Sequence, residues 1–200
     1  MLYGFGRGVL SPFLRRVYHL NVVGEENVPA SGKVILCSNH RSLLDPCFLG
    51  ISVRKRQIFY MAKSELFECH GKWVGRLLRR LGAFPVHRDS GDAASVRTAL
   101  SLLESGKLLG IFPQGKCVFD GSPFQPKAGV AMLAAKSGAD VLPACVYCDG
   151  LVKPFVQVTV RFGSVIPFSS LGLETISKTA VKQAAHQIAE QVNRLLEEKH

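Results

Sequence analysis

The chain has 200 residues and a formal net charge of +10 at pH 7, and this length favours one domain with a hydrophobic core of its own. Hydrophobic residues make up 47% of the sequence, which excludes a disordered chain. The positive charge favours an anionic partner: nucleic acid, an acidic lipid surface, a phosphorylated metabolite or an acidic carrier protein.

Residues 1–20 are predicted to form an amphipathic helical segment, with arginines opposite an apolar face. Ser11-Pro12 is also a good start for a second helix. The apolar face could anchor the protein in a bilayer interface or close the core, and both interpretations stay open. We expect the remainder, residues 21–200, to be a single α/β domain.

His40 and Asp45 lie at a predicted strand-to-helix corner. The apolar run 34–37 is typical of a buried strand, and apolar spacing resumes after residue 42 as in a short helix. A carboxylate in the first helical turn can fold back onto an imidazole in the preceding loop. Such a pair is a general base, because Asp45 orients one ring nitrogen and the other takes a proton from an alcohol or water. The alternative is a solvated pair beside a helix capped by Asn39 or Ser42.

Residues 54–80 are the most basic segment, with eight lysines and arginines against two glutamates. A strand is predicted at 58–62 and a helix from about residue 73, with arginines on its wet side. The charge fits a solvated face or a surface that meets acidic headgroups. No nucleic-acid-binding motif accompanies it, so we expect no nucleic-acid partner.

Strands alternate with helices through the rest of the chain. Further strands are predicted at 83–86, 108–112, 141–146 and 156–162, and helices after Ser90 or Asp92, from 127–129 to about 138, and over about 174–199. This alternation predicts an α/β fold with a central, mostly parallel or mixed sheet flanked by helices.

Polar residues follow four of these strands: His40 with Asp45, Lys63, Arg88, and Gln114 with Lys116. Gathered at one edge of the sheet, they would place a base beside a cationic pocket, which suits an alcohol that carries a phosphate. The run from Gly110 to Lys116 is one residue short of a phosphate-binding P-loop, and Cys117 stands where Ser or Thr should be, so we reject that motif.

The six cysteines are scattered and several lie in apolar runs, which is typical of buried thiols in a reducing compartment. Cys145 and Cys148 form a single CxxC, and zinc would need a second ligand pair at suitable spacing. We therefore expect no metal site. No apolar run is long enough to span a membrane, and arginines near the N-terminus argue against a cleaved signal peptide, so we expect a cytosolic or peripheral protein.

Several stretches resemble, in order, the signatures of the glycerolipid acyltransferases, the lysophosphatidic acid acyltransferase family. They are Asn39-His40-Arg41-Ser42-Leu43-Leu44-Asp45, residues 62–67, Gly82-Ala83-Phe84-Pro85-Val86-His87-Arg88, Phe112-Pro113-Gln114-Gly115 followed by 127–129, and residues 141–146. The family's third signature usually reads Phe-Pro-Glu-Gly-Thr-Arg, so here an amide replaces the carboxylate, Cys117 replaces the arginine and Lys116 brings a cation one position early. His87 stands where the family often has Asp.

The resemblance implies an O-acyltransferase that acts on 1-acylglycerol 3-phosphate to give phosphatidic acid, at the cytosolic side of an anionic membrane. His40, oriented by Asp45, would deprotonate the acceptor hydroxyl, which attacks the thioester of acyl-CoA or of acyl-carrier protein without any cofactor. The implied substrate-binding residues are Asn39, Lys63, Arg88, Gln114, Gly115, Lys116 and Lys127.

Three alternatives remain. One is an acyltransferase of the same fold that uses another acceptor, such as glycerol 3-phosphate or a lyso-aminolipid. Another is a lipid-binding relative with little activity. The third is a basic nucleic-acid binder, which would need stacking aromatic residues on the basic face, and the segment 54–80 offers few of them. Ser42 as a nucleophile is a competing chemistry for the enzyme, but it lacks the Gly-x-Ser-x-Gly elbow and ranks low.

Overall fold

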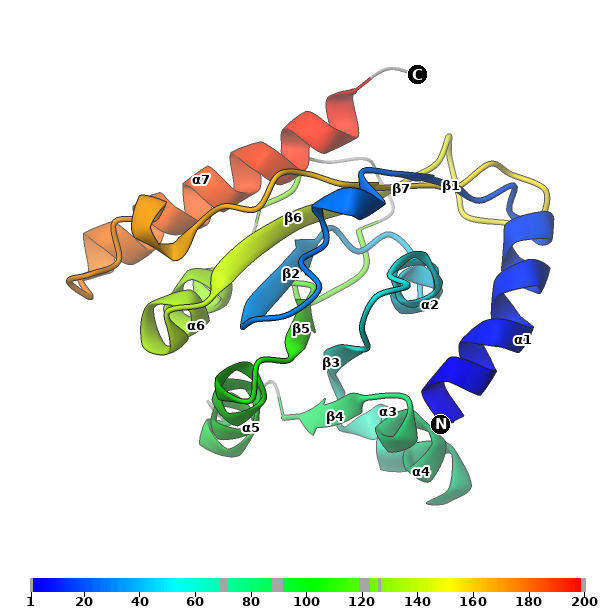
Figure 1. Ribbon diagram of the computed structural model, residues 1–200, viewed down its shortest axis with the longest axis horizontal. Helices are drawn as coiled ribbons and strands as arrows, with labels where there is room; N and C mark the ends of the chain where they lie inside the picture. The colour runs from blue at the N-terminus through cyan, green and yellow to red at the C-terminus, as the bar shows by residue number, and fades with distance from the viewer. Residues whose placement is uncertain (1, 69–71, 88–91, 119–122, 126, 199–200) are drawn as a thin grey trace.

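A mixed β-sheet forms the centre of the protein, with helices on both of its faces (Figure 1). The computed structural model describes residues 2–68, 72–87, 92–118, 123–125 and 127–198. Within these residues the sheet has seven strands in the order β1-β7-β6-β2-β5-β3-β4. The predicted α/β class with a mixed, mostly parallel sheet is confirmed.

The strands are β1 (Asn21–Val23), β2 (Val34–Ser38), β3 (Ile58–Lys63), β4 (Ala83–Val86), β5 (Leu108–Ile111), β6 (Asp140–Tyr147) and β7 (Thr159–Phe162). The α-helices are α1 (Leu2–Val17), α2 (Asp45–Ser52), α3 (Glu65–Glu68), α4 (Lys72–Arg80), α5 (Ala93–Glu104), α6 (Gly129–Ser137) and α7 (Lys178–Glu197). Two 3-10 turns lie at Glu25–Asn27 and Phe168–Ser170.

The strands β6, β2, β5, β3 and β4 all run parallel to their neighbours in this part of the sheet. Their carboxyl ends therefore meet at one edge, which is where open α/β sheets place their ligand sites. Cys37 of β2 is in register with Ile111 of β5. Three residues beyond these two positions, His40 and Gln114 leave the sheet side by side.

Both faces of the sheet are buried, which explains why its central strands are continuous apolar runs. Ile35 and Cys37 of β2 pack with α5, α6 and α7 on one face. Val34 and Leu36 point to the other face and pack with α1 and α2. This alternation continues past the strand end, so Asn39 and His40 leave β2 on opposite faces.

Most helix boundaries follow the signals in the sequence. Asp92 caps α5 by accepting from the backbone N–H groups of Ala94 and Ser95, and Ser177 caps α7 by accepting from Ala180. The helix α7 begins four residues later than predicted. Gly138 ends α6 with φ at +62°, a left-handed conformation that glycine adopts without steric cost.

Three sequence predictions need correction. The helix α1 continues through Pro12, so no second helix begins at Ser11. Buried Leu14 and Tyr18 beyond the proline pack against α2 and the sheet, and this contact holds the last turns in place although Pro12 has no N–H to donate. The strand predicted at 156–162 is shorter than expected. Only its last four residues, which form β7, pair antiparallel with β6. The short strand β1 was not predicted at all.

None of the helices within the described residues is long and apolar enough to cross a membrane.

Candidate active site

Asn39 ties the end of β2 to β6. Its side-chain amide donates to the carbonyl of Val146 (3.0 Å) and accepts from the N–H of the same residue (2.8 Å), and its side chain is buried. The amide thus completes a backbone pairing that a β-strand would otherwise make. A substrate-binding role for Asn39 stays a prediction. In the structure its side chain fixes the backbone directly before His40.

His40 and Asp45 form the predicted pair. Nδ1 of His40 lies 2.9 Å from Oδ2 of Asp45, and the side chains are 14% and 0% exposed. Oδ2 also accepts the backbone N–H groups of Arg41 (2.6 Å) and Ser42 (2.7 Å). With Nδ1 donating to the carboxylate, Nε2 carries the lone pair that a general base needs. The solvated alternative is wrong, because Asp45 is fully buried at the start of α2.

The carboxylate of Asp45 is paired through only one of its two oxygens. Its second oxygen, Oδ1, has no hydrogen-bond partner within the described part of the chain. The negative charge is felt by the neighbouring thiol of Cys47, whose pKa is raised first by burial and then by Asp45. The helix N-terminus, with its positive end of the helix dipole, favours a carboxylate at this position.

Two aromatic rings complete the setting of the imidazole. The ring of Phe112 stacks on that of His40 with centroids 4.3 Å apart, and the ring of Tyr60 stacks with Phe112 at 5.9 Å. The hydroxyl of Tyr60 donates to the carbonyl of Pro46 in α2. Gly110 allows this arrangement, because a Cβ there would lie 2.5 Å from the Tyr60 ring.

The loop after β5 holds the backbone of His40. Oε1 of Gln114 accepts the N–H of His40 at 2.9 Å, and the N–H of Val118 donates to the carbonyl of His40 at 2.7 Å. Gly115 in this loop has φ at +74°. Lys127 lies against it, with Nζ 3.4 Å from the place where a Cβ on Gly115 would be, and the N–H of Lys127 donates to Pro113.

The structure gathers only part of the predicted cationic pocket. Lys127 reaches the loop beside His40, whereas the ammonium group of Lys63 is 3.1 Å from Glu65, and both of these side chains are about half exposed. Lys116 is exposed. Arg88, the predicted phosphate ligand, lies outside the described residues.

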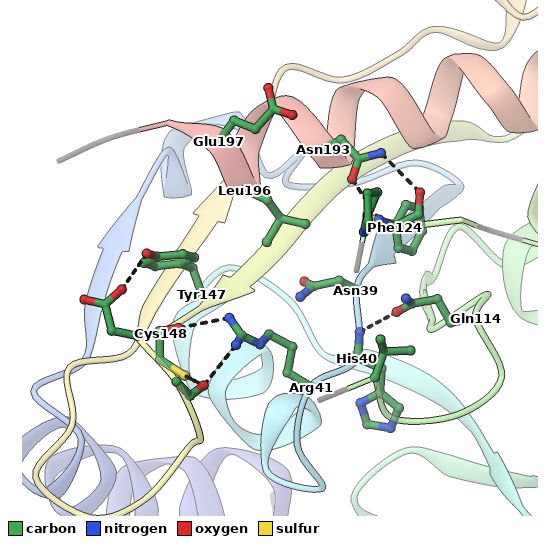
Figure 2. Close-up of a pocket in the computed structure, with 14 residues that line it drawn as sticks. Asn39, His40, Arg41, Gln114, Phe124, Tyr147, Cys148, Asn193, Leu196 and Glu197 are labelled. Atoms are coloured by element: carbon green, nitrogen blue, oxygen red, sulfur yellow. Dashed lines mark hydrogen bonds between the residues drawn. The ribbon is translucent and has the colours of Figure 1, made fainter. Parts of the chain in front are cut away.

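A cavity of about 390 Å³ lies behind the corner, between the end of β6 and the last turns of α7 (Figure 2). Its walls include Asn39, Tyr147 and Leu196. The imidazole of His40 points away from the middle of this group in Figure 2. The cavity therefore meets the catalytic corner mainly through the backbone of His40.

Polar contacts bridge the walls of this cavity. The guanidinium of Arg41 donates to the carbonyls of Cys148 and Gly150, both at 2.9 Å. The side chain of Asn193 in α7 pairs with the backbone N–H and carbonyl of Phe124 at 2.8 and 3.1 Å. Neither contact was predicted, since nothing in the sequence links residues so far apart. Phe112 was predicted only as the last residue of the strand 108–112, and nothing in the sequence indicated that its ring stacks on His40.

Both thiols of the CxxC motif are buried and unbridged, and its structural role stays a prediction. Burial raises the pKa of the Cys145 thiol to about 11 and also raises that of Cys148. The Sγ atoms point to the carbonyls of Leu195 and Gly150. Within the described residues no cluster of His, Cys, Asp and Glu could hold a metal ion.

The fold and the site together define an α/β enzyme in which a histidine, oriented by a buried carboxylate, stands at the carboxyl edge of a parallel sheet. Comparisons with known proteins identify the chemistry. A family model described as Acyltransferase matches residues 19–147. The chain is 34% identical over 143 residues to the 1-acyl-sn-glycerol-3-phosphate acyltransferase of Bacillus subtilis, covering 72% of this chain and 70% of that protein.

A second relative and a solved structure are named as acyltransferases of the same kind. A protein of the same name from Streptococcus pneumoniae is 26% identical over 82% of this chain, which spans only 61% of that longer relative. The fold resembles the crystal structure of the 1-acyl-sn-glycerophosphate (LPA) acyltransferase PlsC from Thermotoga maritima, with a TM-score of 0.67 and 23% identity over 90% of this chain and 73% of that one. The chain belongs to the acyltransferase family and is an O-acyltransferase.

Proposed function

We propose that the protein transfers an acyl group from acyl-CoA or acyl-carrier protein to the free hydroxyl of 1-acyl-sn-glycerol 3-phosphate, which gives phosphatidic acid for phospholipid biosynthesis. The observation that carries the proposal is the 2.9 Å contact between His40 and the buried carboxylate of Asp45. The names of the similar proteins from Bacillus and Streptococcus supply the acceptor.

The reaction needs one proton transfer in each direction. Nε2 of His40 takes the proton from the acceptor hydroxyl, whose oxygen attacks the thioester carbonyl. The tetrahedral intermediate collapses, the new ester bond forms, the carbon–sulfur bond breaks, and the imidazolium returns the proton to the departing thiolate. No acyl-enzyme is needed.

The oxyanion of the intermediate needs hydrogen-bond donors, and two backbone N–H groups just before α2 are already occupied. The N–H groups of Arg41 and Ser42 already donate to Asp45, so they support the base rather than the oxyanion. For the acceptor phosphate, Lys127 beside Gly115 is the best placed of the described cations. We retain Lys63, Lys116 and Arg88 as further proposed ligands.

Thiol release from acyl-CoA, with lysophosphatidic acid as acceptor, tests this proposal. We expect release that depends on the acceptor and disappears in His40→Ala. Glycerol 3-phosphate and acyl-carrier protein, assayed in parallel, decide the acceptor and the donor. Release that needs no acceptor and survives the substitution would indicate a thioesterase, and no release with any pair would favour a lipid-binding relative that has lost activity.

We also propose that the protein attaches peripherally to an anionic leaflet on the cytosolic side, through α4. Gly75 packs against α3, because a Cβ there would lie 2.7 Å from the carbonyl oxygen of Phe67. At 100° per residue, Trp73 and Leu77 must face almost the opposite way. They are 70% and 38% exposed.

The charges of α4 suit such a surface. The helix has exposed arginines at 76, 79 and 80 and no acidic residue. Each basic residue near an anionic leaflet contributes roughly 1 kcal/mol, and an aromatic side chain among them suits the headgroup layer. On α1, Phe13 is 61% exposed and Arg16 is exposed next to the buried face, which supports a second contact with lipid.

Trp73 is the single tryptophan of the chain, so its fluorescence reports directly on α4. We expect a blue shift with phosphatidylglycerol vesicles, none with phosphatidylcholine, and reversal by salt. Arg76→Glu should weaken binding, and Arg97→Glu on the exposed side of α5 is the matched control. No shift and no co-sedimentation with anionic vesicles would refute the attachment.

A further inference from the structure

The side chain of Gln114 is directed at the backbone of the catalytic histidine. The N–H of His40 donates to Oε1 of Gln114 at 2.9 Å. In a glutamine only the carbonyl oxygen can accept, so the donor itself fixes the orientation of the amide. The family resemblance implied that Gln114 binds the substrate, whereas its carbonyl oxygen already accepts a hydrogen bond within the protein.

Two further contacts come from the same loop. Val118 donates its N–H to the carbonyl of His40 at 2.7 Å, and the ring of Phe112 stacks on the imidazole at 4.3 Å. The loop 112–118 therefore holds His40 by its N–H, by its C=O and by its ring. Asp45 from α2 fixes the remaining freedom of the ring through Nδ1.

We propose that Gln114 is a positioning residue, which acts through the backbone of His40 and does not bind the acceptor. The inference rests on the proposed function, because it concerns the same base. It also accounts for the amide where the resembling family usually has a carboxylate. Both groups offer an oxygen that accepts the N–H of His40. The position therefore requires an acceptor of the right reach, and it does not require a charge.

A positioning role has a distinct kinetic signature. A base displaced from the acceptor hydroxyl slows proton transfer, and a shift of 1 Å can cost about a hundredfold in rate. In this proposal other residues bind the acceptor phosphate and acyl chain, so loss of the hydrogen bond to His40 leaves their binding intact. Loss of the contact should therefore lower kcat and leave KM for the acceptor nearly unchanged.

Three substitutions separate reach, shape and charge. Gln114→Met keeps the length of the side chain without an oxygen acceptor, and Gln114→Asn keeps the amide but is one methylene too short. Both should lower kcat about tenfold to a hundredfold, with KM for lysophosphatidic acid within about twofold of the wild type. Gln114→Glu keeps an oxygen at the same reach and should restore most of kcat.

Amide hydrogen exchange at His40, followed by NMR, is a readout that does not depend on turnover. Exchange should be faster in the Met and Asn variants than in the wild type and in the Glu variant. A raised KM with kcat unchanged, or equal exchange in all four proteins, would overturn the positioning role. Absence of acyl transfer by the wild type would instead refute the proposed function, and the exchange rates would still decide whether Gln114 holds His40.

Discussion

Oδ2 of Asp45 accepts the N–H groups of Arg41 and Ser42 while it lies 2.9 Å from Nδ1 of His40. One oxygen atom thus shapes the turn and orients the base. The chain between the two residues must fold back tightly for this to happen, and the buried carboxylate is the centre around which it does so. The orientation of the imidazole and the stability of the turn are therefore coupled.

The first prediction concerns this pair. His40→Ala should lower kcat by about 10²- to 10⁴-fold, the usual contribution of a general base. Asp45→Asn should lower both kcat and stability, because a neutral amide oxygen accepts the N–H groups of Arg41 and Ser42 less strongly than the carboxylate and offers no negative charge to the imidazolium. Steady-state kinetics and urea unfolding measure the two effects. An Asp45→Asn protein with wild-type kcat would contradict the orienting role.

The second prediction separates structure from binding at Asn39. Asn39→Ala leaves the buried N–H and carbonyl of Val146 without partners, which should reduce the free energy of unfolding by about 1–3 kcal/mol. Urea denaturation measures this loss as a lower midpoint with an unchanged m-value. Ser31→Ala in an exposed turn before β2 is the control. Unchanged stability with a raised KM for the acceptor would instead favour substrate binding.

The elements with strong local signals could be predicted from the sequence, and those fixed by distant contacts could not. The strand 34–38 and the pair His40 and Asp45 follow from a local apolar run and a local turn. The pairing of β6 with β7 and the bond from Asn193 to Phe124 depend on which surfaces meet in three dimensions. The hydrogen bond from His40 to Gln114 was missed for the same reason, because the two residues are 74 positions apart.

The third prediction concerns thiol reactivity. Burial raises the pKa of Cys37 and raises that of Cys145 to about 11, so at pH 8 neither carries an appreciable thiolate. Both should resist iodoacetamide in the native protein and react after unfolding in guanidinium, whereas partly exposed Cys117 should be alkylated earlier. Peptide mass spectrometry after timed alkylation decides the order. Fast native modification of Cys145 would argue for a reactive CxxC.

The fourth prediction is a pH dependence of stability from Glu25 and Arg54. A side-chain hydrogen bond from Arg54 lowers the pKa of Glu25 below its ordinary value of 4.5, against the opposing effect of burial. Because the folded-state pKa is the lower one, the stabilisation is complete above about pH 4.5 and is lost as the pH falls through the folded-state value. Glu25→Gln should therefore destabilise the protein at pH 7 and make little difference at strongly acid pH.

Thermal unfolding of Glu25→Gln and of the wild type across this range measures the effect. Glu26→Gln, one residue along the same turn and exposed, controls for the loss of one negative charge. A difference between wild type and Glu25→Gln that grows toward acid pH would have the wrong sign.

The pairing of β1 has a consequence for the order in which the chain can fold during synthesis. Asn21 is in register with Thr159, so the N-terminal strand has its sheet partner 138 positions later. Until β7 has left the ribosome, β1 cannot take its place on a sheet that β2, β5 and β6 can already begin to assemble. β1 is thus fixed on the sheet only after a much later part of the chain has been made, although it precedes every other strand.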